Sequence, residues 1–401
     1  MGIKQTLIKE IGKGSLVTSM RKKVYIAEPP NFNYTFEDYF NVIKSMFKLQ
    51  LSKKTNYIDE RFLFEEKIKK YFNVNYAISV TNCASGIDLA CESINLNSND
   101  EVISCAINFY GTHLSVLRYD AKLILAEVEK NGINISPEDM LKKITTKTKA
   151  VIVTQMNGSS ANMDLINKYI KLKEKEYGKK IYIIEDVARS FGAEYKGKKV
   201  GTLGDISILS FQTKKNFSTL GEGGMIITNN KLIYEKICDL RAFGRCNNYG
   251  TNYKLSRVQC AVGISQLKKI DKNNDKRIKV ALDRNELLKY EDNIYISYPQ
   301  KDSKDIYTYY NVILKENYTR SDRDKIRNLL KEKYNIETCI ANEPTYLTHK
   351  FVEKNVNINE TPYSENLGGR IITLPIHFNM GKKDNKYIVN CFLKVLHSLK
   401  K

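Results

Sequence analysis

The feature that most constrains this chain is a regular alternation of short apolar runs with helical stretches between residues 75 and 229. The runs are almost continuously apolar, which is typical of parallel strands that helices cover on both faces. We therefore predict an α/β fold built on a mostly parallel sheet. The predicted strands are 77–81, 101–105, 122–128, 150–156, 180–186, 206–211 and 223–229.

Helices are predicted between the earlier of these strands. The segment 136–144 opens with Ser-Pro-Glu-Asp, a helix start signal, and 162–177 has apolar residues at three- and four-residue spacing. A further helix is predicted over 85–96. Because ligands of such sheets bind beyond the carboxyl ends of the strands, we expect the functional residues just after strands.

The pattern changes beyond residue 253, where a smaller α/β unit is expected. The predicted segments there are one helix over 253–270, another near 276–290, β structure near 294–314, a helix over 321–334, a short segment at 336–340 and a terminal helix over 383–400. We predict an N-terminal arm over 1–30, a large domain over 31–270 and a small C-terminal domain over 271–401.

Composition narrows the classes of partner and the compartment. The chain has 65 Lys and Arg against 45 Asp and Glu, a formal net charge of +20. Lysine is spread along the whole chain, and its densest run, 171–180, is interleaved with glutamate, so we expect a solvated surface and no nucleic acid partner. Eight cysteines without a CxxC pair indicate reduced thiols and a cytoplasmic protein.

Two further absences in the sequence shape the expectation. No apolar run reaches about 18 residues and the first residues lack the apolar region of a signal peptide, so we expect no membrane association. The four histidines show no metal-ligand spacing, so no metal is assigned.

Four polar features follow predicted strands. Glu185 and Asp186 end one strand, the segment 210–216 leads out of another, 221–224 forms a Gly-Glu-Gly-Gly hairpin, and 80–86 opens a helix. Taken singly, the aspartate and the helix start are better explained by ordinary helix capping. Taken together, a helix N-terminus suits a phosphate, an aspartate suits a protonated ring nitrogen and a lysine suits a Schiff base. Those parts can hold pyridoxal phosphate and use it as an electron sink.

The order of these features resembles the DegT/DnrJ/EryC1/StrS family of sugar aminotransferases, which are pyridoxal-phosphate enzymes of fold type I. The resemblance covers roughly residues 30–395 and is most specific in 183–229, IIEDVARSFGAEYKGKKVGTLGDISILSFQTKKNFSTLGEGGMIITN. That stretch is similar to the family's E-D-x-A-Q…G-A…G…G-D-x…S-F…K…G-E-G-G core. The resemblance implies a mostly parallel seven-stranded sheet in a large domain plus a smaller C-terminal α/β domain.

The resemblance also implies roles for single residues. Lys215, rather than Lys214, matches the Schiff-base lysine by its spacing from Ser210. Asp186 would pair with the pyridinium nitrogen of the cofactor and keep it protonated.

The remaining matched residues would hold the cofactor's phosphate and ring. Ser210, with the backbone N–H groups of Ala84 and Ser85, would bind the phosphate, and Phe109 would stack on the ring. Asn252 matches an asparagine that reaches the phosphate from a neighbouring subunit, which implies a homodimer with shared active sites.

The chain departs from the family pattern at three places. Arg189 stands where the family carries Gln or His, near the phenolic oxygen of the cofactor. A guanidinium there would stabilise the phenolate, lower the proton affinity of the imine, or capture a carboxylate or phosphate of the substrate. Alternatively, Arg189 points away into a salt bridge. Cys83 and Ala84 replace the usual Gly-Thr of the phosphate turn, and the stretch 244–252 is short.

Three functions are compatible with these residues. The first is an aminotransferase that moves an amino group from glutamate to a keto-sugar or a small phosphorylated ketone, in the synthesis of surface polysaccharide such as capsule or lipopolysaccharide. The second is a pyridoxal-phosphate-dependent decarboxylase of an amino acid or phosphoamino acid such as serine phosphate. The third, a basic binding module without catalysis, is disfavoured because Asp186, Ser210, Lys215 and Asn252 are all present.

Overall fold

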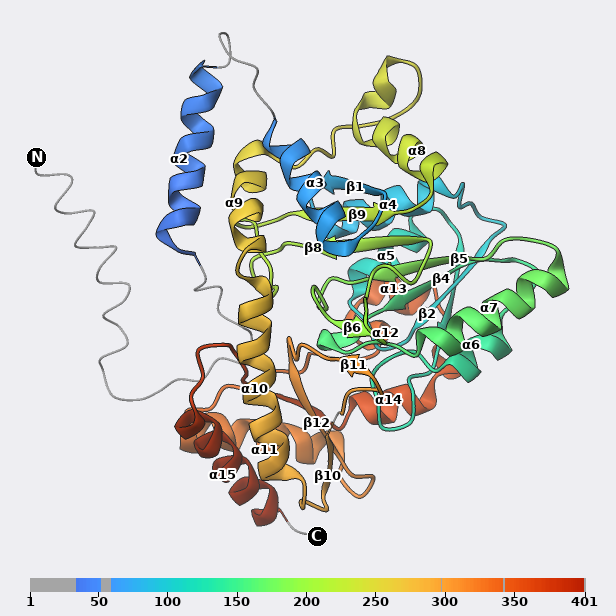
Figure 1. Cartoon of the computed structure of the whole chain (residues 1–401). Helices are drawn as coiled ribbons and strands as arrows, with labels where there is room; N and C mark the ends of the chain where they lie inside the picture. Colours follow the sequence, from blue (N-terminus) through green and yellow to red (C-terminus); the bar gives the residue numbers. More distant parts are fainter. Residues whose placement is uncertain (1–33, 52–58, 297, 342, 400–401) are drawn as a thin grey trace, which may run out of the picture.

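A computed structural model describes residues 34–51, 59–296, 298–341 and 343–399 (Figure 1). The predicted N-terminal arm over 1–30 lies outside the described residues. The centre is a seven-stranded sheet in the order β1-β9-β8-β5-β4-β2-β3, in which only β9 runs antiparallel to its neighbours. The predicted mostly parallel α/β fold is confirmed. Its strands are β1 (Tyr76–Val80), β2 (Glu101–Cys105), β3 (Lys122–Ala126), β4 (Thr148–Thr154), β5 (Tyr182–Asp186), β8 (Ile206–Ser210) and β9 (Gly224–Thr228).

The apolar strands are buried on both faces of the sheet. Side chains of successive strand residues point to opposite faces, so Val151 joins one hydrophobic layer while Ile152 joins the other. One layer is closed by α3 (Glu60–Phe72), α6 (Pro137–Lys143), α7 (Met163–Tyr177) and α9 (Arg257–Leu267). The other is closed by α4 (Cys83–Ser93), α5 (Tyr110–Leu117) and α8 (Lys231–Arg241). This double burial explains why the strands are nearly uninterrupted apolar runs in the sequence.

The structure corrects one predicted helix. The segment 253–270 is not one helix: α9 begins at Arg257, where the side chain of Ser256 accepts from the N–H of Gln259, and a second helix, α10 (Ile270–Leu288), follows at once. Helix α10 therefore starts earlier than the predicted 276. At Ile270 the helix belongs to the hydrophobic layer that contains Val151, whereas at Leu288 it belongs to the core of the C-terminal unit.

The C-terminal unit packs helices on a small antiparallel sheet in the order β10-β12-β13. Its elements are β10 (Ile294–Ile296), β12 (Tyr310–Leu314), α11 (Arg320–Tyr334), β13 (Ile371–Leu374) and α15 (Lys382–Ser398). The intervening helices α12 (Thr345–Thr348), α13 (Lys350–Lys354) and α14 (Pro362–Gly368) instead place Tyr346, Val352 and Leu367 in the two hydrophobic layers of the large sheet. The segment 336–340 contributes only an isolated bridge between Cys339 and Thr373. The predicted domain boundary at 270 stays a prediction, because α10 belongs to both hydrophobic cores.

Two parts lie beside this framework. Helix α2 (Phe36–Leu51) lies along α9 at the edge of the molecule (Figure 1). A third small sheet joins β6 (Glu194–Tyr195), β7 (Lys198–Lys199) and β11 (Ser303–Lys304), and so ties the loop after β5 to the segment that precedes β12.

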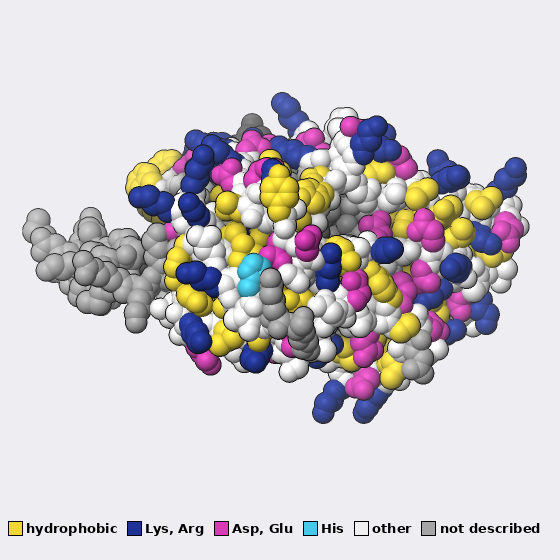
Figure 2. Space-filling view, turned by 90° about the horizontal axis from the view of Figure 1, so that it is seen from below, with side chains coloured by type: hydrophobic (Ala, Val, Ile, Leu, Met, Phe, Trp, Pro, Cys, Tyr) yellow, Lys and Arg dark blue, Asp and Glu magenta, His cyan; other side chains and the backbone are white. Residues whose placement is uncertain are grey.

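The surface carries its positive charge in a dispersed form on the face seen in Figure 2. Lysine and arginine side chains there alternate with acidic and apolar ones rather than forming one basic patch. Within the described residues, no helix combines the length and the apolar character that crossing a membrane requires.

Candidate active site

A cavity of about 550 Å³ opens at the carboxyl ends of the central strands. The last residues of β4, β5 and β8 line it, namely Thr154, Asp186 and Ser210. The first residues of α4 and the turn after β8 also line it, together with residues from the segments 108–112 and 188–189 and with Tyr309. The predicted site residues that line the cavity are Ala84, Phe109, Asp186, Arg189, Ser210 and Lys215.

The Asp186 carboxylate is held by two donors. The hydroxyl of Thr112 donates to Oδ2 over 2.8 Å, and the N–H of Ala188 donates to Oδ1 over 3.0 Å. Asp186 and Thr112 are both buried, and both face the cavity. The sequence did not single out Thr112, because it comes from α5, a helix that was not predicted.

Glu185, the neighbour of Asp186, points to the opposite face of the sheet and serves the fold. Its carboxylate is fully buried and accepts from the side-chain amide of Gln155 and from the N–H groups of Gly201, Leu203 and Gly204, over 2.6 to 2.9 Å. Burial raises the pKa of Glu185, and these four donors oppose that rise. Period-two alternation thus separates the two carboxylates, one to the core and one to the cavity.

Lys215 presents an amine of lowered basicity. Burial, helped by the nearby positive charge of Arg189, lowers the pKa of Lys215 to about 8. The turn that carries Lys215 is closed by its N–H donating to the carbonyl of Gln212 over 2.9 Å. Lys214 and Glu222 also line the cavity. A larger fraction of neutral amine at physiological pH is what nucleophilic attack on an aldehyde requires.

The first turn of α4 faces the cavity through Cys83 and Ala84. N–H groups of a first helical turn have no partner within the helix and favour an anion. The N–H of Ser85 donates instead to the side chain of Asn82 over 2.8 Å, which makes Asn82 the N-cap. Ser85 does not line the cavity, so its predicted role in phosphate binding stays a prediction, as does that of Ala84.

Phe109 projects its ring at the cavity and is half exposed (52%). Its ring lies 4.4 Å from that of Tyr110, centroid to centroid. Gly111 makes this arrangement possible, because a Cβ at that position would lie 2.7 Å from the Phe109 ring.

Arg189 lines the cavity rather than turning away from it. Its Nη1 donates to Oδ1 of Asn157 over 3.1 Å, and its guanidinium carbon lies 4.5 Å from the ring centre of Tyr309. The sequence did not point to Asn157 or Tyr309. No local pattern could have found them, since they reach Arg189 from the loop after β4 and from the segment before β12.

Asn252 lies away from this cavity. It is exposed, in the loop after α8, and forms an isolated bridge with Ala242. Its predicted role in a neighbouring subunit's site stays a prediction.

Histidine takes no part in the cavity wall, and metal-ligand clusters are not found in the described part of the chain. His113 is fully buried between the hydroxyls of Thr345 and Ser104, at 2.7 and 3.1 Å. Burial lowers the pKa of His113 to about 3, so this ring is neutral and structural at physiological pH.

The polar groups that line the cavity fit pyridoxal phosphate. An amine with a lowered pKa, a carboxylate fixed by two donors, a buried serine hydroxyl and a helix N-terminus all border one cavity. Lys215 would bind the cofactor's aldehyde carbon, Asp186 its ring nitrogen, and Ser210 with the start of α4 its phosphate.

Comparison with known proteins agrees with this chemistry. Residues 42–393 match the DegT/DnrJ/EryC1/StrS aminotransferase family. The chain is 30% identical to the GDP-perosamine synthase of Escherichia coli O157:H7, over 84% of this chain and 90% of that protein. It is 26% identical to a spore coat polysaccharide biosynthesis protein of Bacillus subtilis, over 80% of this chain and 85% of the relative.

The fold is also that of a solved aminotransferase. Helicobacter pylori PseC, an aminotransferase involved in the biosynthesis of pseudoaminic acid, superposes with a TM-score of 0.81 at 22% identity. The match covers 94% of this chain and all of that one. The predicted fold type I architecture is therefore confirmed.

Proposed function

Because the chain belongs to the DegT/DnrJ/EryC1/StrS aminotransferase family, whose cofactor is pyridoxal phosphate, we propose that it aminates a keto-sugar or a small phosphorylated ketone. Glutamate is the proposed amino donor, and surface polysaccharide such as capsule or lipopolysaccharide is the proposed destination of the product. The observation that carries this proposal is the single cavity that brings Lys215, Asp186 and Ser210 together. Two relatives, a GDP-perosamine synthase and a spore coat polysaccharide biosynthesis protein, support a sugar as the acceptor of the amino group.

The residues divide the work of the reaction. The Nζ of Lys215 would hold the cofactor at its aldehyde carbon and, when the amino donor is bound, would take up the proton of the donor's α-carbon. Asp186, fixed by Thr112 and Ala188, keeps the ring nitrogen protonated. Bound pyridoxal phosphate supplies the electron sink for the pair left on that carbon. The donor would leave as an oxo acid whose new oxygen comes from water, with its amino group retained at the site; the acceptor ketone would take that amino group and release one water.

We further propose a homodimer, on the evidence of helix α2. Its inner face is polar: Asp38 is buried and accepts from Gln266 over 2.9 Å and from Lys269 over 2.6 Å. Burial alone would raise the pKa of Asp38, but the hydrogen bond from Lys269 and a further one from the hydroxyl of Ser265 lower it. The outer face is apolar and exposed, and consists of Phe36, Tyr39, Phe40, Ile43, Met46 and Phe47.

A helix that turns its aromatic stripe outward is stable in water when another surface covers that stripe. A second copy of this chain is the proposed cover, and Asn252 would then reach the copy's phosphate site. The cysteines in the described residues are all free thiols, which supports the proposed cytoplasmic location.

A donor screen followed by the absorbance of the bound cofactor tests the proposal. With glutamate, we expect conversion of the cofactor to its amine form and release of one 2-oxoglutarate per site. Addition of a nucleotide-linked keto-sugar should then restore the original spectrum. Release of carbon dioxide from serine phosphate, with no change of the cofactor to its amine form, would instead identify the decarboxylase.

A further inference from the structure

Arg189 is held by three residues of the chain at the wall of the cavity. Its carbonyl accepts from the buried hydroxyl of Thr308 over 2.6 Å. Its guanidinium bonds to Asn157 over 3.1 Å and stacks on Tyr309 at 4.5 Å. A stacked and hydrogen-bonded guanidinium has lost most of its rotamer freedom before any ligand arrives.

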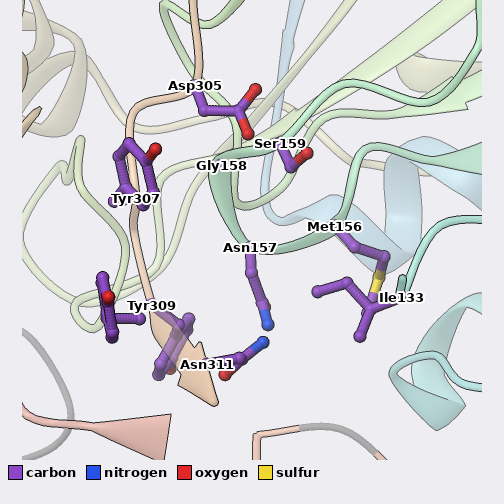
Figure 3. A pocket seen from close by; sticks show the side chains of 10 residues that line it. Ile133, Met156, Asn157, Gly158, Ser159, Asp305, Tyr307, Tyr309 and Asn311 are labelled. Atoms are coloured by element: carbon purple, nitrogen blue, oxygen red, sulfur yellow. The ribbon is translucent and has the colours of Figure 1, made fainter. Parts of the chain in front are cut away.

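The two segments that hold Arg189 are themselves fastened to each other. The carbonyl of Gly158 accepts from the N–H of Ile306 over 2.8 Å, and that of Asn157 from the N–H of Tyr309 over 3.3 Å. Gly158 has φ of +97°, and a Cβ there would lie 2.7 Å from the backbone of Tyr307. Figure 3 shows the loop of Asn157 and Gly158 facing the strand-leading segment of Tyr307 and Tyr309. The two segments that support Arg189 are therefore joined through their backbones.

The guanidinium keeps donors for a ligand. An arginine offers five N–H donors in a planar fork, and within the described residues only the hydrogen bond to Asn157 uses one of them. Arg189 is half-buried and lines the cavity that contains Lys215. The fork is thus available to a planar anion beside the reactive amine.

The position of Arg189 in the cavity of Lys215 favours one class of anion. Arg189 and Lys215 line the same cavity, and Lys215 must reach the α-carbon of the amino donor. The α-carboxylate is one bond from that carbon, whereas the phosphates of a nucleotide-linked sugar lie several bonds from its ketone. A carboxylate also matches the arginine fork in a bidentate geometry.

We propose that Arg189 binds the α-carboxylate of the amino donor, with Asn157, Thr308 and Tyr309 as positioning residues. This inference rests on the proposed function, because it presumes an amino acid donor. It makes Arg189 a determinant of donor specificity.

Two ligands that differ in that group provide the test. α-Methylglutamate retains both carboxylates but has no α-proton to lose, and 4-aminobutyrate is glutamate without its α-carboxylate. Their Kd values for the holoenzyme are measured from the absorbance of the bound cofactor, which reports binding rather than turnover. Arg189→Gln should raise the Kd of α-methylglutamate by roughly 10- to 100-fold, the range expected for loss of a charge-assisted hydrogen bond. The Kd of 4-aminobutyrate should not change.

Further variants separate position from charge. Arg189→Lys should recover only part of the affinity, because it retains the charge and loses the fork. Tyr309→Leu should lower the affinity for α-methylglutamate relative to the affinity for 4-aminobutyrate. A general loss of stability would not change this ratio. Lys331→Gln, an exposed charge removal on α11, is the matched control and should behave as wild type.

The outcomes are distinct. If Arg189→Gln weakens the binding of both ligands equally, or of neither, this inference alone is overturned. Failure of the wild-type holoenzyme to bind α-methylglutamate would overturn the proposed glutamate donor. Normal donor binding without amination of any keto-sugar would overturn the proposed acceptor and leave the assignment of Arg189 in place.

Discussion

The hydroxyl of Thr112 donates to Oδ2 of Asp186 over 2.8 Å and joins α5 to the end of β5. Both residues are buried, so the bond fixes the carboxylate where water does not compete. Together with the N–H of Ala188 on the other oxygen, Thr112 leaves the carboxylate one orientation toward the cavity.

Thr112→Val should therefore impair the use of the cofactor more than the stability of the fold. The variant removes the donor of a buried carboxylate oxygen, and a hydrogen bond to a charged group contributes about 1.5–3 kcal/mol of interaction free energy. We expect a weaker Kd for pyridoxal phosphate and a slower donor half-reaction, both measured from cofactor absorbance. Thr112→Ser retains the hydroxyl and is the control. Equal behaviour of the Val and Ser variants would show that the hydroxyl does not orient Asp186.

The pKa of Lys215 sets a pH profile for cofactor capture. Below pH 8 the amine is mostly protonated and cannot attack an aldehyde, so the rate of capture by the apo-protein should rise through about pH 8 and then level off. An ordinary lysine would level off only near pH 10.5. Arg189→Gln removes a positive charge that lowers this pKa, so its profile should move to higher pH. A variant profile identical to wild type would mean that the two charges do not interact.

Glu185→Gln should destabilise the protein without abolishing cofactor capture. The amide NH2 would face N–H groups that now donate to a carboxylate oxygen, so buried donors lose their acceptor. The expected loss in the free energy of unfolding is roughly 3 kcal/mol or more, measured by urea denaturation. Retention of wild-type stability would contradict the assignment of Glu185 to the fold.

Phe47→Glu should disrupt the proposed dimer. The side chain lies on the exposed apolar face of α2, and a buried charge at an interface is costly. Light scattering should show a dimer for wild type and a monomer for the variant. The control is Leu172→Glu, which changes another exposed apolar residue, on α7, and should remain dimeric. Dimers in both variants would exclude α2 from the interface.

Shared active sites make a separate prediction. Lys215→Ala and Asn252→Ala should each be nearly inactive alone. Mixed dimers contain one site with both defects and one intact site, so mixing the two variants under exchange conditions should restore part of the donor half-reaction. Absence of any recovery, with subunit exchange verified, would place Asn252 outside the partner's site.

The sequence predicted the central sheet closely, because its strands are buried on both faces and appear as apolar runs. Each predicted strand is found within about two residues of its expected position. Helices α2, α3, α5 and α8 were not predicted. The break between α9 and α10 was also missed, since it depends on the cap at Ser256 and on packing rather than on a loss of periodicity.

The sequence likewise predicted only some of the residues of the site. Asp186, Ser210 and Lys215 follow strands, and such positions converge at one edge of a parallel sheet. Thr112, Asn157 and Tyr309 reach the cavity only through tertiary contacts, so no local pattern marks them. The exposed apolar face of α2 likewise became visible only when the packing of Asp38 defined the inner face of the helix.

The identity of the cofactor lysine tests the whole arrangement most directly. The holoenzyme is reduced with borohydride, digested, and the residue that carries the reduced cofactor is located by mass spectrometry. We predict a single labelled residue, Lys215, with labelling abolished in Lys215→Ala and retained in Lys214→Ala. A label on Lys214 or on any other lysine would contradict the proposed site.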